Sequence, residues 1–117
     1  MSIPVEIENL ATEVDNRGPG YLLTSGADGR PHTIELTFTV GGAVLRARSG
    51  KSSARNIDDR PLVALLWPPM EPGGYSLIVD GEALIEGDGD NRTVVITATH
   101  AILHRPAAGG GNDCKTV

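Results

Sequence analysis

The sequence has 117 residues, the length of one domain that can bury a core without disulfides or metals. Its formal net charge is -5, which excludes a general nucleic-acid or anionic-membrane binder, because both need an excess of Lys and Arg. A single cysteine, Cys114, excludes an intrachain disulfide and favours a reducing setting. No signal peptide or membrane-spanning run is apparent, so we expect a cytoplasmic protein without membrane contact.

The N-terminal part of the chain predicts one short helix followed by strands. Apolar residues over 3–14 recur at the spacing of an amphipathic helix. A short strand is expected over 21–25, after a stretch rich in turn residues. Apolar and polar residues then alternate strictly up to Val40, which predicts a half-buried strand that opens at Pro31 or His32.

The middle of the chain predicts a hairpin and then a helix. The two glycines at 41–42 are a strong hairpin signal, and the chain returns as a strand over 43–49. Ser52 or Ser53 is expected to cap a helix of about two turns that ends near Asp59, before a proline breaks it.

Three further strands complete the predicted fold. The nearly continuous apolar run 62–67 predicts a strand buried on both faces. A strand over 75–86 contains Gly81, which suggests a bulge or bend, and a strand over 92–105 follows. The prediction is a mainly β fold, a six-stranded antiparallel barrel with short helices, with a sandwich as the second choice.

We expect one domain over residues 1–106. Residues 107–117 are Gly-rich and polar, so they are expected to be a disordered tail.

The corner between the strand over 43–49 and the following helix is the candidate anion site. A helix N-terminus offers unpaired backbone N–H groups to a phosphate. A P-loop is excluded, because that motif needs a glycine where Leu45 stands. The alternative is an ordinary turn with solvated basic residues. The side chains that could hold a phosphate here are Ser49, Lys51 and Ser52, with Arg46, Arg48 and Arg55 adding charge-assisted hydrogen bonds.

The histidines do not predict a metal site. His100 and His104 lie four residues apart on a strand, so about 13 Å separates them, too far for one metal ion. They are expected to be surface or interface residues. His32 is expected to be a turn residue, and Cys114 is not expected to be a nucleophile.

Several short motifs, in order, resemble one known family. They are the segments 21–25 (YLLTS), 28–32 (DGRPH) and 53–57 (SARNI), the last followed by Pro61, and the segment 79–83 (VDGEA). Together they resemble the pyridoxamine 5'-phosphate oxidase-like split-barrel family. The resemblance implies a split barrel that binds FMN or the deazaflavin F420 and forms a homodimer, with the cofactor between the subunits.

The resemblance also implies a set of cofactor-binding residues. Many members carry a lysine where this chain has Ser53, and the nearby lysine is Lys51. The dimer or ring-side surface is expected to include Trp67, Tyr75 and the face with the two C-terminal histidines. The residues implied for cofactor binding are Arg46, Arg48, Ser49, Lys51, Ser52, Arg55 and Asn56.

The leading functional hypothesis is an FMN- or F420-dependent oxidoreductase acting on a small molecule. No catalytic residue can be named, because the cofactor carries the hydride chemistry in such enzymes. A second hypothesis is a non-catalytic dimeric split barrel that has lost cofactor affinity, for which the serine at position 53 is the main argument. A third is a β-sheet interaction domain unrelated to flavins. The choice between FMN and F420 stays open.

Overall fold

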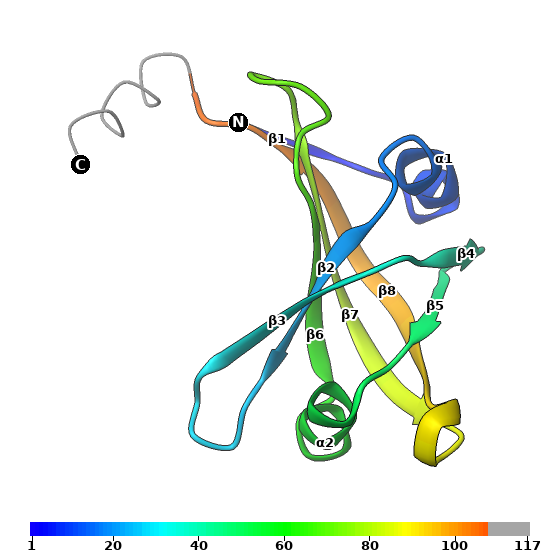
Figure 1. Ribbon diagram of the computed structural model, residues 1–117. Helices are drawn as coiled ribbons and strands as arrows, with labels where there is room; N and C mark the ends of the chain where they lie inside the picture. The colour runs from blue at the N-terminus through cyan, green and yellow to red at the C-terminus, as the bar shows by residue number, and fades with distance from the viewer. Residues whose placement is uncertain (108–117) are drawn as a thin grey trace.

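A single curled antiparallel sheet dominates the fold (Figure 1). The computed structural model describes residues 1–107. Its strands are β1 (Ser2–Pro4), β2 (Gly20–Ser25), β3 (Pro31–Leu36), β4 (Thr39–Gly41), β5 (Val44–Arg48), β6 (Leu62–Trp67), β7 (Ser76–Glu86) and β8 (Thr93–His104).

Seven strands follow the order β3-β2-β6-β7-β8-β5-β4, and the eighth, β1, pairs with the end of β8. Neighbouring strands are antiparallel, and the sheet curls into a half-open barrel (Figure 1). The mainly β, antiparallel barrel predicted from the sequence is therefore confirmed. The strand count is larger than the predicted six.

Helix α2 connects β5 to β6 and lies at the end of the sheet opposite α1 (Figure 1). Within the described residues, no helix is long and apolar enough to cross a membrane. The helices are α1 (Leu10–Asp15) and α2 (Lys51–Asp59), with two short 3₁₀ helices, η1 (Ile7–Asn9) and η2 (Gly89–Asn91).

Two predicted elements differ in the structure. The strand predicted up to Val40 is broken between β3 and β4, because Phe38 turns its ring into the core and β4 pairs with β5 instead. The helix predicted over 3–14 is only α1 and the turn before it. Residues Ser2–Pro4 pair instead with β8, an edge position that tolerates the missing N–H of Pro4.

Two smaller predictions about α2 and β6 were wrong. Gly50 is the N-cap of α2, without a side-chain cap, so neither Ser52 nor Ser53 caps the helix. Strand β6 is buried on one face only, and Leu62 on its other face is 68% exposed. The predicted irregularity at Gly81 is confirmed by a register shift between Asp80 and Gly81.

Trp67 is the centre of the core. It is fully buried, and Phe38 packs edge-on against it with ring centroids 5.5 Å apart. Its Nε1 donates a hydrogen bond to the main-chain oxygen of Gly18 at 3.0 Å. A Cβ on Gly20 would lie 2.5 Å from the indole, so only glycine fits there. The expectation that Trp67 belongs to a dimer or ring-side surface is wrong, because strand alternation turns it inward.

The predicted domain and tail boundaries stay predictions. Of the expected tail over 107–117, only Ala107 lies within the described residues, and Cys114 lies outside them.

Candidate functional site

A hollow of about 400 Å³ lies between the hairpin joining β2 to β3 and the exposed side of α2. We call it the basic hollow. Residues 52, 55, 56 and 59 share one helix face, since positions three and four apart are neighbours on a helix. Its lining consists of Gly26, Ala27, Asp28, Arg30, Pro31 and His32 from the hairpin side, and Ser52, Arg55, Asn56, Asp59 and Arg60 from the helix side.

Cations exceed anions in this hollow. Arg30, Arg55 and Arg60 outnumber Asp28 and Asp59. Asp28 accepts a hydrogen bond from the main-chain N–H of Arg30 at 2.9 Å. Within residues 1–107, neither Arg30 nor Arg55 makes a side-chain hydrogen bond or ion pair. Two guanidinium groups are therefore available to an anion.

His32 contributes a second unused group. Its Nδ1 is buried and has no hydrogen-bond partner within the described chain. Buried polar atoms in folded proteins nearly always have a partner from protein or water. The Nδ1 of His32 is an exception, and its burial keeps it from direct contact with a ligand in the hollow.

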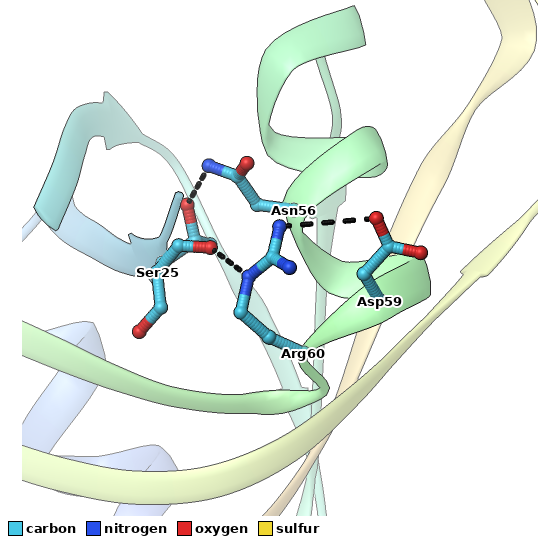
Figure 2. Close-up of polar contacts among 5 residues, drawn as sticks. Ser25, Asn56, Asp59 and Arg60 are labelled. Carbon is cyan, nitrogen blue, oxygen red and sulfur yellow. Dashed lines mark hydrogen bonds and ion pairs between the residues drawn. The ribbon is translucent and has the colours of Figure 1, made fainter. Parts of the chain in front are cut away.

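Two hydrogen bonds join the helix side of the basic hollow to β2, and a longer ion pair lies within the helix side (Figure 2). Asn56 Nδ2 donates to Thr24 Oγ1 at 3.0 Å. Arg60 Nε donates to the main-chain oxygen of Ser25 at 2.7 Å, and its Nη2 lies 3.9 Å from Asp59. The helix side is thereby tied to the end of β2.

A second hollow of about 490 Å³ adjoins the basic one and shares Pro31 with it. We call it the apolar hollow. It opens on the outer side of the sheet, beside the bulge in β7. A smaller depression lies where α2 leads into β6. It shares Ser25 with the apolar hollow and Arg60 with the basic hollow. The apolar hollow is lined by Leu23, Thr24, Ser25, Pro31, Leu62, Val63, Ala64, Asp80, Gly81 and Thr99.

The structure brings three of the residues predicted for cofactor binding together. Ser52, Arg55 and Asn56 all line the basic hollow. Sequence reasoning missed Arg30 and Arg60, and it treated His32 as a turn residue. The available signal was that Arg30 and His32 flank a proline directly after a tight turn.

The other predicted residues lie elsewhere. Arg46 and Arg48 lie on the exposed face of β5. Arg46 pairs with Glu86 at 3.1 Å, and Arg48 Nη2 donates to a main-chain oxygen in the β7–β8 turn at 2.9 Å. Ser49 Oγ donates to the main-chain oxygen of Gly50. Lys51 is exposed at the start of α2 and lines neither the basic hollow nor the apolar hollow.

Ser53 occupies the position at which a lysine was expected. It is 1% exposed, and its Oγ has no partner within the described residues. It is buried together with Ala54 and Ile57 on the core side of α2. Ser53 is therefore not part of the basic hollow.

The C-terminal histidines make separate contacts. His100 Nδ1 lies 3.8 Å from Asp80, and His104 Nδ1 lies 3.1 Å from Ser2 Oγ. Tyr75 contacts the N-terminal residue through its hydroxyl, and Arg105 lies 4.5 Å above its ring. Tyr75 and His104 therefore lie together beside β1.

No family model matches the sequence. Two uncharacterized mycobacterial proteins, one from Mycobacterium bovis and one from Mycobacterium tuberculosis, are each 34% identical to it, over 89% of this chain and 82% of theirs. The chain belongs to the same family as these two proteins.

Solved structures identify the fold. A putative pyridoxamine 5'-phosphate oxidase from Listeria innocua matches with a TM-score of 0.69 and 20% identity, over 84% of this chain and 98% of its own. The protein has the fold of this structure, a split barrel. A FAD-binding protein from Mycobacterium smegmatis matches this split barrel with a TM-score of 0.63 and 15% identity, over 90% and 100% of the two chains. An F420 reductase matches with a TM-score of 0.63 and 23% identity, over 83% and 97%.

Proposed function

We propose that this split barrel binds the phosphate of FMN or of F420 in the basic hollow. The observation that carries the proposal is the pair Arg30 and Arg55, whose guanidinium groups line one hollow without a partner in residues 1–107. Guanidinium groups bind phosphate oxygens in a bidentate manner, and such charge-assisted hydrogen bonds are about twice as strong as neutral ones. Ser52 and His32 also line this hollow.

The neighbouring apolar hollow fits the other half of such a cofactor. A flavin or deazaflavin joins a flat, largely apolar ring to a phosphate, and a largely apolar hollow here adjoins a basic one. Leu23, Leu62 and Ala64 supply the apolar surface, while Asp80 and Thr99 supply polar groups. When bound, the cofactor supplies hydride transfer, and the protein binds and orients it. The proposed activity is therefore the oxidation or reduction of a small molecule.

The comparisons support this choice of cofactor class. The similar structures include two of FAD-binding proteins and one of an F420 reductase. FMN and F420 both remain candidates, because a phosphate and a flat ring are common to both. We place the activity in the cytoplasm, on the expectation from the single cysteine in the sequence.

The test is a titration of purified protein with FMN and, separately, with F420, followed by the absorbance of the cofactor. We expect one of the two cofactors to stay bound through gel filtration. Its absorbance spectrum should shift, because the bound ring moves from water into the apolar hollow. If neither cofactor is retained and neither spectrum changes, the proposal is wrong.

We also propose that two copies pair through the outer face of the sheet. This face carries Tyr21, Leu66, Ile78 and Ile102, which are cross-strand neighbours over β2, β6, β7 and β8 and are only half-buried. Sheets with apolar residues on both faces are normally covered on both. A second copy would supply that cover and would place the apolar hollow beside the subunit interface.

Sedimentation velocity over a range of concentrations tests the dimer. Wild-type protein should sediment at twice the chain mass of 12.2 kDa. Ile78→Glu, which puts a charge in the centre of the outer face, should weaken dimerisation by about 30-fold or more, or ~2 kcal/mol. Asp58→Lys, on an exposed position of α2, is the control and should leave the dimer intact. A wild-type monomer at about 100 μM, far above the dissociation constant of a stable dimer, would contradict this proposal.

One observation favours the alternative of a non-catalytic dimeric module. The position at which the family resemblance implies a lysine holds the buried Ser53, and Arg46 and Arg48 are already engaged within the chain. A split barrel of this kind would keep the outer face and lose cofactor affinity. The cofactor titration separates the two candidates.

A further inference from the structure

Two of the contacts in Figure 2 connect the helix side of the basic hollow to the strand that leads into its hairpin side. Asn56 on α2 donates to Thr24, and Arg60, directly after α2, donates to the main-chain oxygen of Ser25. Thr24 and Ser25 are the last two residues of β2, which leads into the hairpin that carries Arg30. The helix wall and the hairpin wall are therefore joined at one point.

Thr24 has no access to the basic hollow. Its side chain is 2% exposed, and it does not belong to the lining of this hollow. Its branched side chain is stiff about χ1, so Oγ1 offers Asn56 an acceptor in a fixed direction. Any influence of Thr24 on an anion in the basic hollow must therefore pass through Asn56 and the position of α2.

Some polar groups on the helix side of the basic hollow hold β2, and another is available to a ligand. Asn56 uses Nδ2, and Arg60 uses Nε, to hold β2. Arg60 also approaches Asp59 at 3.9 Å. Arg55, on the same wall, makes no such contact within residues 1–107 and remains available to a ligand.

We propose that Asn56 and Arg60 are positioning residues that set the width of the basic hollow through Thr24 and Ser25. In this arrangement they fix the helix side, which carries Arg55, relative to the hairpin side, which carries Arg30. A site whose walls are held before binding loses less free energy to ordering when the ligand arrives. The proposal rests on the proposed function, in that the anion is the phosphate of the cofactor.

Thr24→Val is the decisive variant, because it removes the acceptor for Asn56 and leaves every lining group of the basic hollow in place. Thr24 also lines the apolar hollow, so the probe is inorganic phosphate, which has no ring to occupy that hollow. We expect affinity for phosphate to fall about tenfold, the order of loss found when the outer-shell partners of metal ligands are removed. Thr24→Ser keeps the hydroxyl and should restore most of the affinity. Thr39→Val, on an exposed position of β4, is the control for the exchange of threonine for valine.

The opposite outcome is equally clear. If Asn56 is itself a ligand, Thr24→Val frees its amide, and the affinity stays unchanged or rises. That result would overturn the proposal.

A measurement without ligand keeps the proposal testable if neither cofactor nor phosphate binds. Amide hydrogen exchange by NMR should become faster in Thr24→Val for the hairpin and for α2, including the N–H of Gly26, which is bonded to the oxygen of Arg30 at 2.9 Å. Exchange in β7 and β8 should change less. Equal changes in all these elements would show a general loss of stability and overturn the positioning role. A failure of cofactor binding alone would overturn only the proposed function.

Discussion

Replacing Trp67 with alanine should lower the free energy of unfolding by about 3 to 5 kcal/mol, the range for large aromatic side chains in a core. Trp67 is fully buried, packs against Phe38, and donates its indole N–H to Gly18. Removal of the ring leaves a cavity and an unpaired main-chain oxygen. Gly20 cannot fill that space, because it has no side chain. Urea unfolding followed by circular dichroism measures the change.

A matched control separates burial from the loss of side-chain mass. Met70 lies in the loop after β6 and is 64% exposed. Met70→Ala should therefore change the free energy of unfolding by less than about 0.5 kcal/mol. A Trp67→Ala variant that loses less than about 1 kcal/mol would show that this core is not organised around the indole.

The second large effect concerns cofactor affinity. The double variant Arg30→Gln and Arg55→Gln removes both unpartnered guanidinium groups from the basic hollow. Hydrogen bonds to charged groups contribute about 1.5 to 3 kcal/mol each, so FMN or F420 should bind about 100-fold more weakly, or worse. Fluorescence or absorbance titration of the wild type and the variant measures the ratio of the two dissociation constants.

The chain offers a control with the same change in charge. Arg46→Gln and Arg48→Gln also remove two positive charges, but those side chains are engaged with Glu86 and with a main-chain oxygen. We expect the control to weaken binding by less than about threefold, because exposed charges at a distance are largely screened by salt. The reverse ranking would place the phosphate at β5, where the sequence first suggested it.

The fold was predictable mainly where local patterns decide it. Alternating strands, the hairpin glycines and the bulge at Gly81 follow from backbone preferences that a sequence displays directly. The break after β3 was not predictable, because Phe38 leaves the strand pattern to pack on Trp67, a partner distant in sequence. Similarly, β1 depends on pairing with the far end of the chain.

The candidate site was predictable only in part for a related reason. The motif around α2 pointed to Ser52, Arg55 and Asn56, which do share one hollow. The hairpin side of the hollow comes from the residues before β3 and its first two residues, and no local pattern showed that Arg30 and Arg55 line one hollow. The sequence also could not show that Arg46 and Arg48 already make contacts within the chain, because their partners are distant in sequence.

The measurement that tests the central claim most directly is a crystal structure of the protein grown with FMN and, separately, with F420. The account predicts that the phosphate of the bound cofactor lies within hydrogen-bonding distance of the guanidinium groups of Arg30 and Arg55. A bound cofactor whose phosphate instead contacts Arg46, Arg48 or Lys51, with no ligand in the basic hollow, would contradict it.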